Sequence, residues 1–258
     1  MTFDPLMSLA GLVIGFVIGL TGMGGGALLT PVLVLFFHVP TLAAVSSDLV
    51  VSLMVKPVGA LVHHRNRTVR TDIFRWLAAG SIPTAFAGSA ALQLAGAESL
   101  NAWLQVALGV TLLLAASGMV LRSRLRRTPA ANGDTAASPL RPIPTLMIGI
   151  AGGLIVGLTS VGSGSLMIVV LMWVYPRLGT AELVGTDLAQ AVPLVASAAL
   201  GHLLFGDVRF AIVGSLLMGA LPGVWLGSRV SSQGRDALVR PVLIAILGAT
   251  GLKLTGVF

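Results

Sequence analysis

The chain has 258 residues, of which 55% are hydrophobic and 10% are charged, and its mean hydropathy is +0.97. A soluble domain of this length carries about 25% charged residues, so these proportions exclude a water-soluble globular fold. The net charge is +7, but the basic residues lie between apolar segments, which is a membrane topology signal, and we expect no nucleic-acid partner. The absence of cysteine excludes disulfide frameworks, thiolate metal sites and cysteine nucleophiles. We expect neither a metal nor a cofactor.

Ten apolar segments follow one another along the chain and predict an all-α polytopic membrane protein, because about 20 apolar residues in a helix cross the hydrocarbon core. The segments lie near residues 6–21, 25–38, 44–62, 73–94, 100–121, 143–159, 165–176, 184–204, 210–227 and 237–256. The second and seventh segments are short for full spans.

The basic residues are distributed unevenly over the connections between these segments. Thirteen of the 16 lie after the third, fifth, seventh and ninth segments. With each segment reversing the direction of the chain, all these connections share one side of the membrane. Basic connections mark the cytoplasmic side. We therefore expect a multi-pass protein of the cytoplasmic (inner) membrane with both termini outside.

An internal repeat relates the two halves of the chain. At an offset of 138 residues the first glycine-rich stretch matches the second, and at an offset of 139 Asp48 matches Asp187. The stretches GSIPTAFAGS and GALPGVWLGS also align at the second offset. These matches predict a first transmembrane repeat at 1–121, a flexible cytoplasmic linker at 122–142 and a second transmembrane repeat at 143–258.

Each predicted repeat holds five segments, and because five is odd the two repeats must cross the bilayer in opposite directions. Inverted repeats are the usual architecture of secondary transporters, in which substrate binds near the bilayer midplane where broken helices meet. We therefore predict two inverted repeats, with broken or re-entrant half-helices at the short second and seventh segments.

Two glycine clusters predict the positions of these breaks. Residues 22–26 contain four glycines, and a helix that continued through them would be less stable by about 4 kcal/mol. The repeat-related cluster at 161–165 opens the seventh segment in the same way. A new helix N-terminus offers free N–H groups and a positive dipole end, which together favour an anion. The predicted substrate-binding residues are Thr21, Gly22, Gly24, Gly25, Gly26, Lys56, Thr159, Gly162, Ser163, Gly164 and Ser165.

Close helix packing is the alternative role for glycine, since small residues let membrane helices approach one another. We favour packing for Gly11, Gly15 and Gly19, which are spaced by four residues. We favour an anion site for the clusters at 22–26 and 161–165.

Ionisable side chains within spans are functional candidates, because each costs at least ~2.5 kcal/mol at a helix centre. Lys56 lies two turns after Asp48 and is placed to neutralise a bound anion or to pair with a carboxylate. Alternative roles are helix capping for the two aspartates, snorkelling for Lys56, and an interfacial or capping position for the histidines. The candidates for a proton-coupling or structural role are Asp48, Asp187, Gln190, His63 and His202.

Three stretches resemble the sulfite exporter TauE/SafE family, also called TSUP. They are GLTGMGGGALLTPVL, SSDLVVSLMVKPVGALVHH and GTDLAQAVPLVASAALGHLLFGDV. The resemblance extends over almost the whole chain. It implies transport of sulfite, sulfonates or other small sulfur-containing anions across the cytoplasmic membrane.

The predicted function is a secondary transporter of a small sulfur-containing anion, of the sulfite or organosulfonate class, with export and proton linkage through Asp48 or Asp187. The alternatives are an anion channel with the same site and a carrier for a different small anion. No GxxxxGK[ST] motif is present, so ATP is not the expected direct energy source. We expect no enzyme activity. The expected partners are the small anion and the lipid bilayer, and the sequence leaves open whether copies form a homo-oligomer.

The charge distribution predicts the result of cysteine labelling in this cysteine-free chain. A cysteine at Gly96 should react with an impermeant maleimide from outside the cell, whereas a cysteine at Asn132 should react only after the membrane is opened. The opposite labelling pattern would invert the predicted topology.

Overall fold

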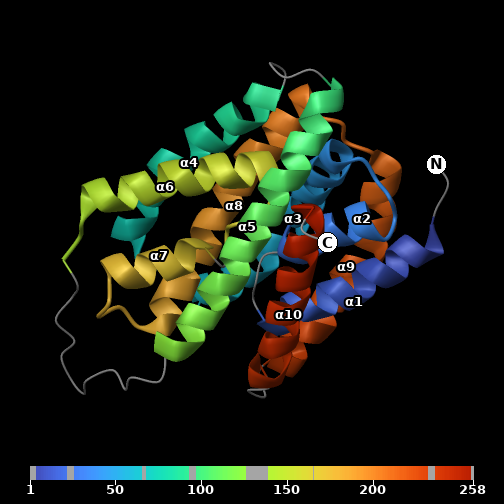
Figure 1. Cartoon of the computed structure of the whole chain (residues 1–258). Coiled ribbons are helices and arrows are strands. Elements are labelled where there is room, and N and C mark those ends of the chain that lie inside the picture. Colours follow the sequence, from blue (N-terminus) through green and yellow to red (C-terminus); the bar gives the residue numbers. More distant parts are fainter. Residues whose placement is uncertain are drawn as a thin grey trace.

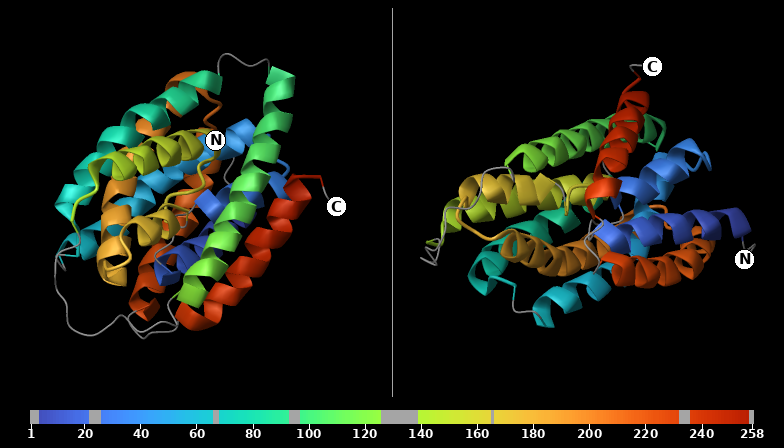
Figure 2. Two further views of the ribbon diagram at one scale, coloured as in Figure 1. Left: turned by 60° about the vertical axis from the view of Figure 1, so that its left-hand side comes forward. Right: turned by 90° about the horizontal axis from the view of Figure 1, so that it is seen from below.

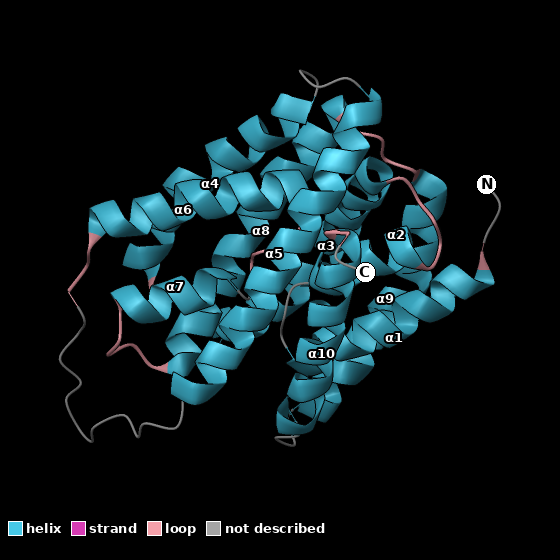
Figure 3. Cartoon of the chain, in the orientation of Figure 1, coloured by secondary structure: helices cyan, strands magenta, loops and turns pink. Residues whose placement is uncertain are grey.

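The computed structural model describes residues 4–21, 26–65, 68–92, 97–125, 139–164, 166–231 and 236–256. Within these ranges the chain forms ten helices and no strands (Figures 1 and 3). The helices are α1 (Pro5–Thr21), α2 (Gly26–Leu35), α3 (Thr41–Arg65), α4 (Thr71–Ala91), α5 (Ala97–Leu125), α6 (Pro142–Thr159), α7 (Leu166–Val174), α8 (Thr180–Phe205), α9 (Phe210–Ser231) and α10 (Asp236–Leu254). The predicted all-α fold is confirmed.

The helix boundaries follow the predicted apolar segments closely, with three differences. Helices α3 and α8 begin at Thr41 and Thr180, a turn earlier than predicted. Helix α5 continues to Leu125, into the predicted linker. Residues 126–138 of that linker lie outside the described part of the chain.

The two short helices are too short to cross a membrane. Helix α2 has 10 residues and α7 has 9. At 1.5 Å per residue each is about 15 Å long, which is half of the ~30 Å hydrocarbon core. They are therefore half-helices, as the sequence predicts.

The helices pack in pairs that join the two halves of the chain. The most extensive contacts are between α1 and α9, α4 and α6, α4 and α8, α3 and α8, and α5 and α10. Figure 2 shows α5 beside α10 and α1 beside α9 in separate views. Every one of these pairs unites a helix of residues 1–125 with a helix of residues 142–254. The two halves thus form one interlocked bundle.

Glycines set the close approach of α1 to α9. A Cβ on Gly15 would lie 2.5 Å from the carbonyl oxygen of Ala220, and a Cβ on Gly223 would overlap the backbone of Leu12. Added methyl groups at these positions would force the helices apart. The packing role predicted for Gly11, Gly15 and Gly19 is confirmed, since each faces the backbone of α9.

The outer surface of the bundle is apolar, as a lipid-facing surface must be. Large exposed side chains include Phe36, Ile143 and Trp173, each more than two-thirds exposed at 72%, 73% and 68%. Among the described residues four helices are long and apolar enough to span a bilayer. They are Asn101–Leu121, Pro142–Thr159, Ala181–Phe205 and Phe210–Arg229. The protein is a polytopic membrane protein.

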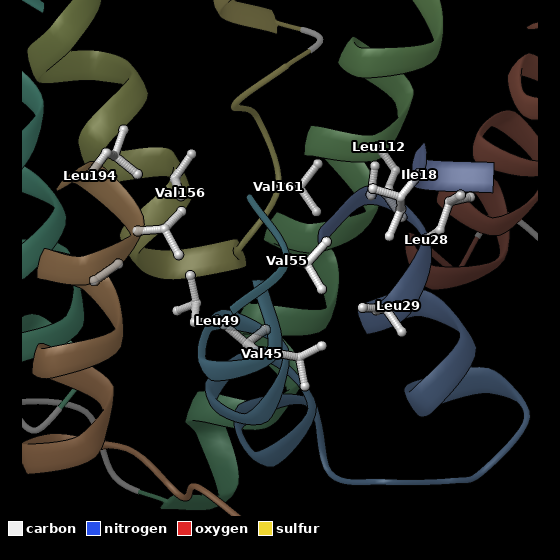
Figure 4. Close-up of a cluster of buried hydrophobic side chains, with 14 of the residues drawn as sticks. Ile18, Leu28, Leu29, Val45, Leu49, Val55, Leu112, Val156, Val161 and Leu194 are labelled. Carbon is white, nitrogen blue, oxygen red and sulfur yellow. The ribbon is translucent and has the colours of Figure 1, made fainter. Parts of the chain in front are cut away.

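The buried core surrounds the half-helices and draws on both halves of the chain. It unites Leu28 of α2 and Val55 of α3 with Val156 of α6 and Val161, which follows α6 (Figure 4). Because α2 begins inside this core, its N-terminus lies within the protein rather than against lipid.

The glycine contacts predict a position-specific loss of stability. Gly15→Ala should lower the free energy of unfolding by about 1–3 kcal/mol, because overpacking a tight contact shifts the backbone. Gly214→Ala is the matched control, since a Cβ at Gly214 on α9 meets nothing within 4 Å. Thermal unfolding of both variants in detergent measures the difference. Equal melting temperatures would contradict the packing assignment.

Candidate functional site

The second glycine cluster is a true helix break. Helix α6 ends at Thr159 and α7 begins at Leu166. Gly162 has φ +131° and Gly164 has φ +94°, a region that glycine adopts without strain and other residues avoid. The predicted break between α6 and α7 is therefore confirmed. Ser165 lies outside the described residues.

The first break faces the second. Helix α1 ends at Thr21 and α2 begins at Gly26. A Cβ on Gly26 would overlap the carbonyl oxygen of Ser160, which follows the last residue of α6. The start of α2 therefore touches the second break through its backbone. Of the predicted site residues here, Gly22, Gly24 and Gly25 and the side chain of Thr21 lie outside the described part of the structure.

Asp48 joins α3 to both half-helix regions. Its Oδ2 accepts hydrogen bonds from Thr30 Oγ1 of α2 (2.6 Å) and from Ser160 Oγ at the second break (2.9 Å). Its Oδ1 accepts a bond from Ser52 Oγ (3.3 Å). The capping interpretation of Asp48 is wrong, because α3 begins at Thr41 and Asp48 lies two turns inside the helix.

Lys56 is buried beside the second break. Its side chain is only 4% exposed, and its Nζ donates a hydrogen bond to Ser163 Oγ (2.7 Å). It also interacts electrostatically with the carboxylates of Asp48 and Asp187. The snorkelling alternative is wrong, because the ammonium group points into the protein. The structure thus brings together two predicted site residues that lie 107 positions apart.

The repeat-equivalent Asp187 is fully buried two turns inside α8, which begins at Thr180. The capping interpretation is therefore wrong here too. Gln190 follows one turn later, and its Nε2 donates to Ser81 Oγ of α4 (2.6 Å). This polar group ties α8 to α4.

His202 binds three helices together from within the core. The ring of this fully buried residue of α8 contacts Ser46 Oγ of α3 through Nδ1 (2.7 Å) and the Gly157 carbonyl of α6 through Nε2 (2.7 Å). Because a carbonyl oxygen only accepts, Nε2 carries a proton. The interfacial position considered for His202 is wrong. The side chain of His63 lies outside the described residues.

Thr159 uses its hydroxyl within the break itself. Thr159 Oγ1 donates to the Ile155 carbonyl (2.8 Å) and accepts a bond from the Val161 backbone N–H (3.3 Å). It therefore stabilises the end of α6, and its predicted role in substrate binding stays a prediction.

Sequence reasoning missed four polar partners of the site: Thr30, Ser46, Ser81 and Ser160. Each is a small hydroxyl residue inside an apolar segment or directly beside a glycine cluster. That pattern was the available signal, but serine and threonine in membrane helices also bond to their own backbone.

Comparison with known proteins decides the family. The pattern of the sulfite exporter TauE/SafE family matches residues 7–254. The chain belongs to this family. A relative named "Probable membrane transporter protein YjnA", from Bacillus subtilis (strain 168), is 36% identical over 250 residues, which cover 95% of this chain and 97% of the relative. A second relative from the same organism, "Probable membrane transporter protein YdhB", is 22% identical over 249 residues, which cover 96% of this chain and 99% of the relative.

No solved structure matches this TauE/SafE chain. The family and its relatives identify it as a membrane transporter and not an enzyme.

The hydrogen bonds that hydroxyl groups donate to Asp48 predict that removing this carboxylate destabilises the protein more than removing a surface carboxylate does. Asp48→Ala should lower the free energy of unfolding by about 2 kcal/mol or more, because the buried hydroxyls of Thr30, Ser52 and Ser160 lose their shared acceptor. Asp207→Ala should change it by at most about 1 kcal/mol, because Asp207 forms an exposed ion pair with Arg209. Denaturant unfolding in detergent measures both values. Similar losses in the two variants would show that the bonds to Asp48 contribute little.

Proposed function

We propose that this TauE/SafE protein is a secondary transporter that exports a small sulfur-containing anion, of the sulfite or organosulfonate class, across the cytoplasmic (inner) membrane in a proton-linked cycle. Family membership supports the substrate class. The positive-inside bias of the connections supports an orientation with both termini outside.

The contact between Lys56 and Ser163 at the meeting point of the two breaks is the observation that carries this proposal. A half-helix N-terminus contributes roughly half a positive charge. Two such ends and one ammonium group together offer roughly two positive charges, from which any ionised carboxylate of Asp48 or Asp187 subtracts, so the arrangement favours a small anion. Ser163 Oγ, the hydrogen-bond partner of Lys56, belongs to the same break and offers a polar group to an anion oxygen.

We also propose that the two halves are inverted repeats that move against each other during transport. Two hydrogen bonds at repeat-equivalent positions support this. The Arg70 backbone N–H donates to Thr186 Oγ1 (2.9 Å), and the Arg209 backbone N–H donates to Ser47 Oγ (3.2 Å). The connection before α4 thus contacts α8 in the same way that the connection before α9 contacts α3. In secondary transporters of this kind, one repeat rocks against the other around a fixed site.

The direct test is a binding screen followed by a flux assay. Thermal stability of the detergent-purified protein is measured against sulfite, thiosulfate, sulfate and several sulfonates, and stabilisation by a sulfur oxyanion or sulfonate is expected. Counterflow of radiolabelled sulfite in proteoliposomes then identifies a carrier. Flux without counterflow would indicate a channel instead, and stabilisation only by unrelated anions would contradict the substrate class.

The position of Lys56 predicts how charge removal affects binding. Lys56→Met should weaken anion affinity by about tenfold to a hundredfold, because a charged hydrogen bond is worth about 1.5–3 kcal/mol. Lys56→Arg keeps the positive charge, so its anion affinity should fall less than that of Lys56→Met. Anion titrations followed by thermal shift provide the affinities. Unchanged affinity in Lys56→Met would remove Lys56 from the site.

The double change Asp48→Asn with Lys56→Met separates two roles of the lysine. If Lys56 also neutralises Asp48 in the empty protein, the double variant should recover part of the affinity lost in Lys56→Met. Strict additivity of the two single losses would exclude that interaction.

A further inference from the structure

The two repeat-equivalent aspartates have different polar neighbours. Asp48 accepts bonds from three hydroxyl groups, those of Thr30, Ser52 and Ser160. In α8 the residue one turn after Asp187 is Gln190, whose amide is both donor and acceptor. The two aspartates therefore differ in the polar side chain that their own helix places one turn further on, a hydroxyl group after Asp48 and an amide after Asp187.

Gln190 offers a buried acceptor that the described residues leave unused. Its side chain is fully buried, and its Nε2 donates to Ser81 Oγ (2.6 Å). Its Oε1 has no hydrogen-bond partner among the residues that the structure describes. A buried acceptor left in this way is unfavourable, because it has lost its bond to water and gained no other. Residues three apart on a helix are neighbours, so an O–H on the carboxyl group of Asp187 has an acceptor within reach.

We propose that Asp187 binds the coupling proton, that Gln190 Oε1 accepts the O–H of its protonated carboxyl group, and that Ser81 holds the amide in the orientation that does so. Asp48 keeps its bonds to Thr30 and Ser160 and holds α2 and the second break in place. The inference rests on the proposed proton-linked transport and names the group that carries the proton.

Gln190 serves both protonation states of Asp187. When Asp187 is protonated, Gln190 presents Oε1 to it and donates from Nε2 to Ser81. When Asp187 is ionised, rotation of the amide by half a turn presents Nε2 to the carboxylate, and the Ser81 hydroxyl then donates to Oε1. Leucine at this position provides neither arrangement, because it has no donor and no acceptor.

The charged groups around Asp187 link its proton to the anion. Lys56 on α3 interacts electrostatically with Asp187. An ionised Asp187 competes with an anion for this ammonium group, and protonation of Asp187 releases the lysine to the anion. Helices α6 and α7 carry no titratable side chain, whereas α3, α4 and α8 carry others. Those on α3 and α4 are Asp48, His63, His64, Arg65, Asp72 and Arg75, and those on α8 itself are Glu182 and His202.

Anion and proton therefore bind together and strengthen each other's binding by the same factor. A divalent anion that moves with one proton keeps a net negative charge. The inside-negative membrane potential then still favours its exit.

Infrared titration of the detergent-purified protein tests the assignment without any substrate. A protonated carboxyl group gives a C=O stretching band that grows as the pH falls. When the spectrum of Asp187→Asn is subtracted from that of wild type, the difference spectrum should contain such a band from a buried carboxyl group. The repeat-equivalent Asp48→Asn should retain the band, and Gln190→Leu should shift it because the O–H loses its acceptor. Gel filtration and thermal unfolding identify any variant that fails to fold.

The band pattern decides the inference. Persistence of the band in Asp187→Asn, its loss in Asp48→Asn, or a wild-type spectrum without a titrating buried carboxyl would each overturn the proposal.

A flux assay separates this inference from the proposed function. In proteoliposomes with an internal pH dye, wild type should move protons with sulfite, and Asp187→Asn should reduce protons moved per sulfite by about tenfold or more. An unchanged ratio would overturn the role of Asp187. Absence of sulfite counterflow in wild type would contradict the proposed substrate, and the infrared titration would still decide whether Asp187 is the proton site.

Discussion

Backbone N–H and C=O groups at membrane depth have no water to bond to, so a helix can be interrupted there only where the protein itself covers the free ends. This chain interrupts two apolar segments, and the start of the helix after the first interruption lies against the second. The start of α2 at Gly26 lies directly against the carbonyl of Ser160, with no room for a Cβ. Two unusual features of the bundle follow from this contact: its half-length helices and its small residues at backbone contacts. Helices α2 and α7 are half-length because they begin inside the protein, and small residues are required wherever two backbones touch.

The buried charges follow the same constraint. A charge in hydrocarbon is tolerated where it faces the interior of the bundle and finds polar partners. Asp48 collects hydroxyl donors from α2, α3 and the second break, and so connects these three parts of the protein through one carboxylate. Lys56 places the opposite charge on the other side of that break. At the proposed site, binding of an anion beside Lys56 would change the balance of charge at the point where the two halves meet. That is where a transporter has to sense its substrate.

The sequence was sufficient for the fold because apolar length and glycine position are local properties. The ten segments and the break before Leu166 are examples. The site was predicted in part. Lys56 and Ser163 were both chosen as candidates, but their contact spans 107 positions, and no local pattern shows such a pairing. Thr30 and Ser160 were missed for the same reason. The capping interpretation of Asp48 failed because the apolar pattern placed the start of α3 too late, and residues 41–43 are in fact helical. The predicted role of residues 22–25 and Ser165 in substrate binding stays a prediction, because these residues lie outside the described part of the chain.

Anomalous diffraction from crystals soaked in selenite, a heavier analogue of sulfite, tests the central claim most directly. If the two breaks and Lys56 form the anion site, the strongest selenium peak should lie within hydrogen-bonding distance of Lys56 Nζ, between the start of α2 and the start of α7. A selenium peak confined to the surface of the bundle, with none beside Lys56, would contradict the account.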